Sequence, residues 1–138
     1  MPMIVLWLSG QPKGQKRVRH HGKGHWHDKD QKLAEGNIIR KWEEAGEPRF
    51  PDTPALRIDL TLYIARPASH FKRDGTLSAE GLRHPRPENK KPDVDNALKL
   101  VMDALNKRAY KDDVQVVESL VERHWADWPA TKIKISAI

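Results

Sequence analysis

Five residues near the middle of this 138-residue chain have the side chains and the spacing needed to cut a phosphodiester bond. Asp93 and Asp95 are one residue apart, Lys99 follows one helical turn later, and Asp112 and Asp113 are adjacent. Mg²⁺ prefers oxygen ligands and keeps several of its waters, so a few carboxylates suffice to hold it. Such an ion activates water and offsets phosphate charge. We interpret these residues as a candidate metal-dependent phosphodiester-cutting site, with Lys99 close enough to reach the phosphate or the attacking water.

Simpler explanations exist for single members of this group. Asp93 could be an ordinary helix cap, and Asp95 with Lys99 could be a surface ion pair four residues apart. Neither accounts for the adjacent like charges of Asp112 and Asp113. A calcium loop is excluded, because apolar residues stand where its ligands and glycine belong. The opposed carboxylates of a glycosidase stay open on spacing, but the basic composition gives no reason to favour them.

Composition points to a nucleic acid as the partner. Lys and Arg number 25 against 19 Asp and Glu, a formal net charge of +6, and there are no cysteines. A basic surface attracts nucleic acid first and anionic membranes second. No apolar run approaches the roughly 20 residues of a membrane span, and residues 1–9 lack the pattern of a secretory signal. We therefore expect a cytoplasmic protein that does not enter membranes.

Two basic segments are candidates for phosphate contact. The first is a glycine-broken stretch over residues 11–29, which we interpret as a DNA-binding loop. The second precedes Asp93. The candidate DNA-binding residues are Lys13, Lys16, Arg17, Arg19, Lys90 and Lys91. The first loop also carries His20, His21, His25 and His27, but a zinc site needs a firmer frame than a glycine-rich loop provides.

Hydrophobic periodicity predicts an α+β fold with a mixed sheet of about four strands and two helices. The strands are expected at 3–8, 56–65, 114–126 and 131–138, and the helices at 30–45 and 93–107. The segment 114–126 also suits a helix, and we favour a strand because it is rich in β-branched residues. The length predicts one domain over residues 1–138.

A long basic loop is expected at residues 66–92, where no period of 2 or 3.6 survives. Connections this long without their own structure are usually functional or disordered. We expect this one to be mobile when free and ordered on a polyanion, although an insertion without consequence is the alternative.

The distance between the two acidic groups raises a geometric question. A helix over 94–107 is roughly 20 Å long, and residues 108–113 can retrace that length only if nearly extended. Either the chain returns directly to the helix start, or the helix is shorter, or Asp113 serves a site that a second subunit completes.

The acidic segment resembles the RusA family of Holliday-junction resolvases, phage and prophage endonucleases that cut four-way DNA. The resemblance lies in Lys90-Lys91-Pro92-Asp93-Val94-Asp95-Asn96-Ala97-Leu98-Lys99, in Asp103-Ala104-Leu105, and in Tyr110-Lys111-Asp112-Asp113. It covers about 26 residues densely, and the basic stretch from Gly10 to Arg17 resembles the family more weakly.

The resemblance implies specific roles. Asp93, Asp95 and Asp113 would bind Mg²⁺ or Mn²⁺, and Lys99 would be the essential lysine. Asp112 lies beside the site with an open role, and Tyr110 either stacks on an unpaired base or packs in the core.

The resemblance also implies a RusA-like fold and a homodimer that makes paired symmetric nicks in four-way junctions during recombination and repair. A two-fold dimer suits a two-fold junction. The alternatives are a non-catalytic, structure-selective DNA-binding module and a nuclease that acts on flaps or forks. The length of 66–92 and the histidines of the first loop depart from the family pattern, which bears on substrate fit.

Overall fold

A four-stranded mixed sheet carries the fold, with the strands in the order β1-β4-β2-β3. The computed structural model describes residues 3–15 and 29–138. Strands β2 and β3 are parallel, whereas β4 is antiparallel to both β1 and β2. The strands are β1 (Met3–Ser9), β2 (Leu56–Ile64), β3 (Val116–Trp125) and β4 (Ala130–Ala137). The helices are α1 (Lys29–Glu44), α2 (Ala79–Arg83) and α3 (Val94–Leu105), with short 3-10 turns η1 (Ala68–His70) and η2 (Asp113–Gln115). The α+β prediction is confirmed.

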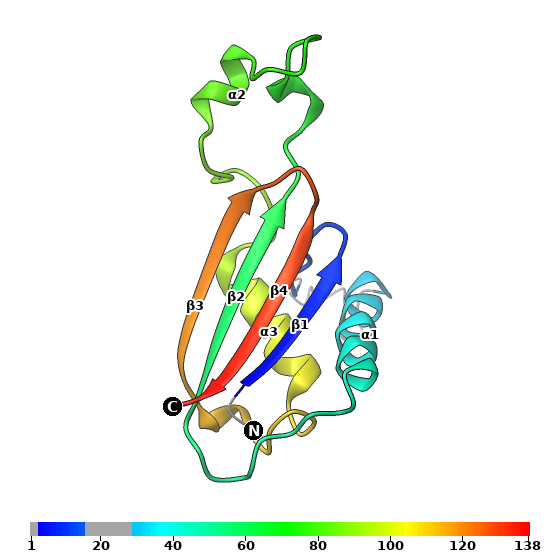
Figure 1. Ribbon diagram of the computed structural model, residues 1–138, viewed down its shortest axis with the longest axis vertical. Coiled ribbons are helices and arrows are strands. Elements are labelled where there is room, and N and C mark those ends of the chain that lie inside the picture. Colours follow the sequence, from blue (N-terminus) through cyan, green and yellow to red (C-terminus); the bar gives the residue numbers. More distant parts are fainter. Residues whose placement is uncertain (1–2, 16–28) are drawn as a thin grey trace, which may run out of the picture.

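The core lies between one face of the sheet and the two long helices. In Figure 1, α3 passes behind the strands and α1 lies beside β1. Strand β2 shows why: every second residue from Leu56 to Ile64 is buried, and the residues between them are half-exposed. Such alternation places one face of a strand on a core and leaves the other open. The buried residues of α1 are Ala34, Ile38 and Trp42, whereas Leu33 is 64% exposed. No helix in the described part of the chain is long and apolar enough to cross a membrane.

Parallel strands need a long crossover, and here residues 65–115 connect β2 to β3. Helix α3 forms the second half of this connection and buries its apolar side on the sheet through Ala97, Leu100 and Val101. The packing fixes where α3 begins and ends, and therefore where its polar residues face solvent.

The segment 66–92 is ordered and has its own local structure, so the prediction of a structureless loop is wrong. It contains η1, α2 and a bridge between Phe71 and Leu77, and it extends beyond the end of the sheet (Figure 1). Arg66 Nη1 donates to the backbone oxygens of Gly81 and His84, at 3.0 and 3.2 Å. Trp125 Nε1 donates to the same His84 oxygen at 2.8 Å. Hydrogen bonds from side chains to the backbone hold this segment in place. A segment held in this way shows no hydrophobic periodicity in its sequence, so the periodicity analysis could not detect its structure.

A matched pair of glycines tests this order. A Cβ at Gly81 would lie 2.4 Å from the backbone oxygen of His70, whereas a Cβ at Gly36 of α1 meets nothing within 4 Å. Gly81→Ala should therefore open residues 66–92 and speed their amide hydrogen exchange at least roughly tenfold, with the core exchanging as before. Gly36→Ala should instead stabilise the protein by about 1 kcal/mol, because alanine is the better helix former. Unchanged exchange in Gly81→Ala would contradict the close packing of α2 on η1.

Candidate active site

The start of α3 presents the first group of candidate residues. Asp93 occupies the N-cap position, Asp95 lies in the first turn, and Lys99 follows one turn later on the exposed side. The buried face of α3 is occupied by apolar residues, so these polar side chains are left on the surface. The amide end of a helix also carries partial positive charge, which favours carboxylates at this place.

The simpler explanations for these residues do not hold in the structure. The Asp93 side chain makes no capping hydrogen bond. Its carboxylate instead accepts from Lys91 Nζ at 3.0 Å and from Asn96 Nδ2 at 3.4 Å. Asp95 and Lys99 form no ion pair and no side-chain hydrogen bond with any residue that the structure describes, and both are exposed. Asp95 and Lys99 are thus available to a ligand, and Asp93 lies beside them with local partners only.

The N-terminal loop lies directly against this helix start. The backbone amide of Gln15 donates to the backbone oxygen of Asn96 at 2.9 Å. A Cβ on Gly14 would lie only 2.6 Å from Pro92 Cβ. Lys13 is exposed on the same loop, half-exposed Lys90 and exposed Lys91 precede Asp93, and positive charge therefore flanks the carboxylates. The other candidates of this loop, which are Lys16, Arg17, Arg19 and the four histidines His20, His21, His25 and His27, lie outside the described residues.

Asp113 belongs to a second group at the far end of α3. Tyr110 Oη donates to Asp113 Oδ1 at 2.8 Å and lies 3.3 Å from the Met102 oxygen. The Tyr110 side chain is fully buried, so it packs in the core and offers no ring face to a base. Asp112 caps η2 by accepting from the Val114 amide at 3.1 Å. The Asp112 carboxylate, adjacent to that of Asp113, thus stabilises the start of η2, a role that the sequence did not reveal.

Burial and like charges act on this second group. Burial raises the pKa of Asp113 above its usual range, the carboxylates of Asp103 and Asp112 raise it further, and the Tyr110 hydrogen bond opposes the rise. Burial also raises the pKa of Tyr110, with the neighbouring Asp113 adding to the effect. Tyr110 therefore remains a hydrogen-bond donor at neutral pH, and it orients an aspartate whose charged form is poorly stabilised.

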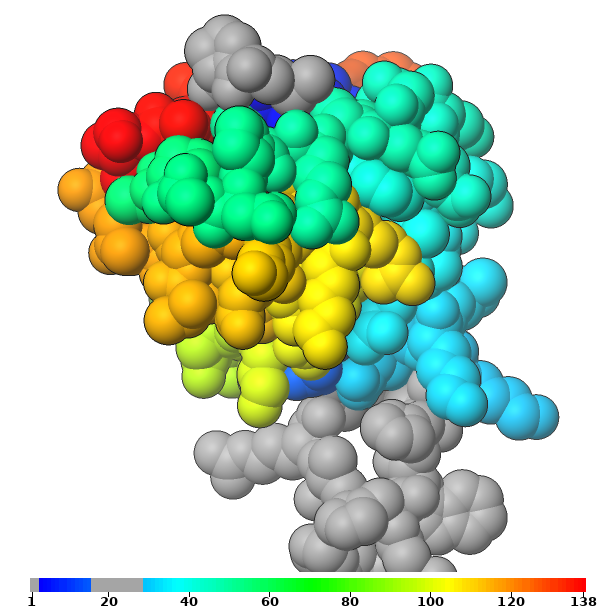
Figure 2. Space-filling view, turned by 90° about the horizontal axis from the view of Figure 1, so that it is seen from below, coloured from blue at the N-terminus to red at the C-terminus, as the bar shows by residue number. Residues whose placement is uncertain are grey.

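The two groups are separated by the length of a helix. Helix α3 has 12 residues, which corresponds to about 18 Å. The chain does not run back along it, because Tyr110 contacts the last turn. Viewed from below, the yellow end of α3 lies against the gold segment that carries Asp113 (Figure 2). The residues that the structure describes contain no group of three or more His, Asp or Glu side chains that could hold a metal ion.

The donor chemistry of each group still suits a hard cation. Mg²⁺ in nucleic-acid enzymes is commonly held by one or two carboxylates together with waters and substrate phosphates. Asp93 and Asp95 supply such a pair at the surface, where a phosphate can approach. Within one chain, Asp113 does not join Asp93 and Asp95 in a group that could hold a metal ion. Its role as a metal ligand stays a prediction, and it would need a second copy of the chain.

Two residues that contribute to this arrangement escaped the sequence analysis. Arg123 on β3 donates from Nη1 to the backbone oxygens of Lys90 and Pro92, which fixes the approach to Asp93. No local pattern marks that role. Asp103 accepts a hydrogen bond from Gln15 Nε2 and raises the pKa of Asp113. Its signal was present, because Asp95, Lys99 and Asp103 follow one another at helical spacing of four.

Comparison with known proteins gives two matches. The family model described as endodeoxyribonuclease RusA matches residues 9–136, which is nearly the whole chain. A Bacillus subtilis (strain 168) protein, the uncharacterized protein YqaN, is 30% identical over 143 residues, and the match covers 100% of this chain and 99% of that protein.

Asp113→Asn should stabilise the protein at neutral pH. A carboxyl whose pKa is raised on folding weakens the native state as pH rises through the window between its unfolded and folded values. The asparagine side chain keeps an oxygen that can accept from the Tyr110 hydroxyl, and it carries no charge. We expect the melting temperature to rise on the order of 2 °C at pH 7, since one kcal/mol corresponds to roughly 2–4 °C at this size.

The gain should vanish at pH values low enough to protonate Asp113 in both states. Asp127→Asn is the control, because this aspartate is exposed and outside both acidic groups. Thermal melts followed by circular dichroism over a pH series measure the effect. An unchanged or lower melting temperature at pH 7 would show that the charge on Asp113 does not lower the free energy of unfolding.

Proposed function

This chain belongs to the RusA family of endodeoxyribonucleases, and we propose that it resolves four-way DNA junctions by metal-dependent, paired nicks. One observation supports the proposal most: half-exposed Asp93 and exposed Asp95 and Lys99 lie at a helix start flanked by basic residues, and Asp95 and Lys99 have no side-chain partner among the described residues. Polar groups positioned on a rigid element in this way are typical of sites that bind a ligand.

In the proposed site, Asp93 and Asp95 would hold Mg²⁺, or Mn²⁺, together with the phosphate. The ion would supply an activated water and neutralise developing negative charge. Lys99 would contribute a second positive charge facing the same phosphate. Lys13, Lys90 and Lys91 would contact the neighbouring backbone phosphates, which position DNA without reading its sequence.

We infer that Asp113 completes the site of a second copy of the chain. Tyr110 joins Asp113 to the carbonyl oxygen of Met102, which lies about 10 Å along the axis of α3 from Asp95. A two-fold dimer would allow the far end of one α3 to approach the near end of the other. The same symmetry would place two sites on the two equivalent strands of a junction. The dimer, the metal, the role in recombination and repair, and a cytoplasmic location remain proposals.

The first test removes one carboxylate. Asp95→Asn should reduce cutting of a labelled four-way junction in Mg²⁺ by about 100-fold or more, because the amide is a poor ligand for a hard cation. Junction binding should persist, since less negative charge remains near the phosphates. Asp127→Asn should cut normally. The same assay on junction, fork and plain duplex at fixed salt separates a resolvase from a fork nuclease.

Full cutting by Asp95→Asn would remove the basis for this site. Binding of junction DNA by the wild type without any nick, over a range of Mg²⁺ and Mn²⁺, would favour the non-catalytic module instead.

The second test asks whether the site is shared. If Asp95 and Asp113 from different chains form one site, a dimer of one Asp95→Asn chain and one Asp113→Asn chain contains one site with both changes and one intact site. Mixing the two inactive variants after unfolding and refolding should restore single nicks at roughly a quarter of the wild-type sites, since half of the random dimers carry one intact site. A supercoiled cruciform plasmid reports this result as nicked circles without linear product.

Each variant refolded alone provides the control and should stay inactive. If both single variants are inactive and their mixture is inactive too, every site draws both aspartates from one chain, and the shared site is wrong while the nuclease assignment stands.

A further inference from the structure

We propose that residues 66–92 form a second DNA contact, in which the cleft at their base binds a backbone phosphate of a junction arm. The cleft has a volume of about 470 Å³ and is lined by Arg66, Arg86, Arg123, His124 and Trp125 together with two prolines. It lies outside the two acidic groups of α3. The inference rests on the proposed function only in that the ligand is DNA.

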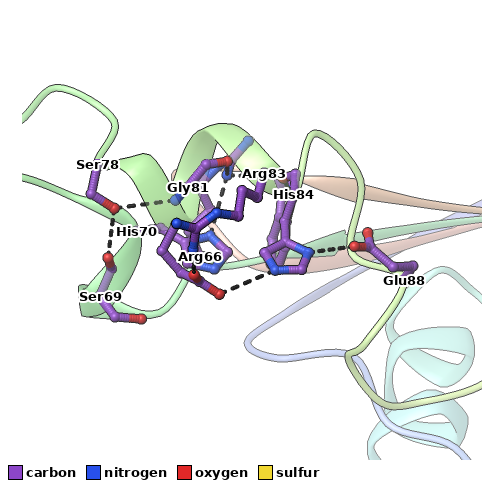
Figure 3. A network of polar contacts seen from close by, with 10 residues as sticks. Arg66, Ser69, His70, Ser78, Gly81, Arg83, His84 and Glu88 are labelled. Carbon is purple, nitrogen blue, oxygen red and sulfur yellow. Dashed lines mark hydrogen bonds and ion pairs between the residues drawn. The ribbon is translucent and has the colours of Figure 1, made fainter.

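The acidic residues of this segment are already paired within it. Glu80 accepts from Arg83 Nη1 at 2.6 Å and lies 3.1 Å from His84 Nε2. Glu88 pairs with His84 Nδ1 (Figure 3). Asp74 accepts from the amide and the hydroxyl of a threonine two residues later, at 3.0 and 2.6 Å. The carboxylates of the segment therefore all have hydrogen-bond partners within it, and Glu80 and Glu88 are paired with its basic groups.

Its positive charges are arranged differently. Lys72, Arg73 and Arg86 are exposed, and none of them has an ion pair or side-chain hydrogen bond in the described part of the chain. Exposed cations without partners keep their full charge for a polyanion. They extend from the cleft at the base of the segment, where Arg86 lies, to the turn between Phe71 and Leu77. Cations at these two places of the segment can contact different backbone phosphates of one DNA arm.

The walls of the cleft are rigid. The Arg66 guanidinium carbon lies 5.0 Å from the centre of the Trp125 ring, and His70 packs edge-on against the same ring with centroids 5.3 Å apart. Arg66 is further fixed by its bonds to the backbone of the segment (Figure 3). Positive groups held in advance lose little freedom when a phosphate binds, so more of the attraction becomes affinity.

The cleft also connects to the candidate active site. Arg123 lines the cleft and donates to the oxygens of Lys90 and Pro92, immediately before Asp93. The arm contact and the start of α3 are therefore parts of one packed unit, and a DNA arm held in the cleft has a fixed relation to the site of cutting. An acidic protein surface is the competing occupant, and the test below distinguishes it.

The test compares two neighbouring arginines. Arg86 is unpaired, whereas Arg83 is paired with Glu80; both are exposed and carry the same charge. Dissociation constants for a four-way junction and for plain duplex are measured from low to moderate salt. We expect Arg86→Ala to reduce the steepness of log Kd against log salt by about 0.9, the value for one lost phosphate contact. The triple variant with Lys72→Ala and Arg73→Ala should lose about 2–3, and Arg83→Ala about none.

Circular dichroism and hydrogen exchange of residues 66–92 establish that each variant keeps the folded segment. If the dissociation constant of the triple variant depends on salt as steeply as that of the wild type, the arm contact is overturned. An acidic protein surface then remains as the candidate occupant of the cleft. Equal losses in Arg83→Ala and Arg86→Ala overturn it as well, because they indicate a general charge effect. If the triple variant has a reduced salt slope and the wild type never nicks DNA, the arm contact is supported and the proposed function is rejected. If the triple variant has an unchanged salt slope and the wild type nicks junctions, the arm contact is rejected and the proposed function is supported.

Discussion

The stiffness of α3 is the constraint on which the arrangement of charged groups depends. A helix packed by Ala97, Leu100 and Val101 on a sheet cannot bend to bring its two ends together. Asp95 at one end and Asp113 beyond the other are therefore kept apart, with Lys99 and Asp103 between them on an open side. In the function that we propose, each end of α3 would supply part of a site, and two copies of the chain would complete it around a symmetric substrate.

The start of the same helix is held from several directions. Gly14 allows the N-terminal loop to approach Pro92 closely, and Gln15 bonds to the Asn96 oxygen. Arg123 holds the chain just before Asp93 from the sheet. None of these anchors uses the side chains of Asp93, Asp95 or Lys99. Groups fixed in this manner need little reorganisation when charge develops on a ligand. Stability is given up locally, most clearly at Asp113, where burial and like charges oppose ionisation.

Much of the fold could be predicted from the sequence because its signals are local. Strand β2 alternates strictly, and α3 begins after Pro92 with a clear apolar face. The dense pattern around Asp93 identified the family, which the match over residues 9–136 confirms.

The remainder depends on contacts between distant residues. The ordered segment 66–92 is held by Arg66 and Trp125, which lie 59 positions apart. The sheet order places β2 between β3 and β4, although only a short turn joins those two strands. The position of Asp113 was open because periodicity predicted α3 to end near residue 107 rather than at Leu105, and could not show that Tyr110 would fold under its last turn. Each of these features follows from packing that no short window of sequence contains.

The place of β4 in the sheet has a consequence for the order of assembly. Strand β1 pairs only with β4, and Ser9 meets Ala130. Strand β1 is therefore synthesised long before its partner β4, and the buried Ile133 and Ile135 of β4 complete the core only then. Such distant pairing slows folding. Residues 93–113 are therefore synthesised before β4, and the sheet that orients them is complete only after β4 has paired with β1 and β2.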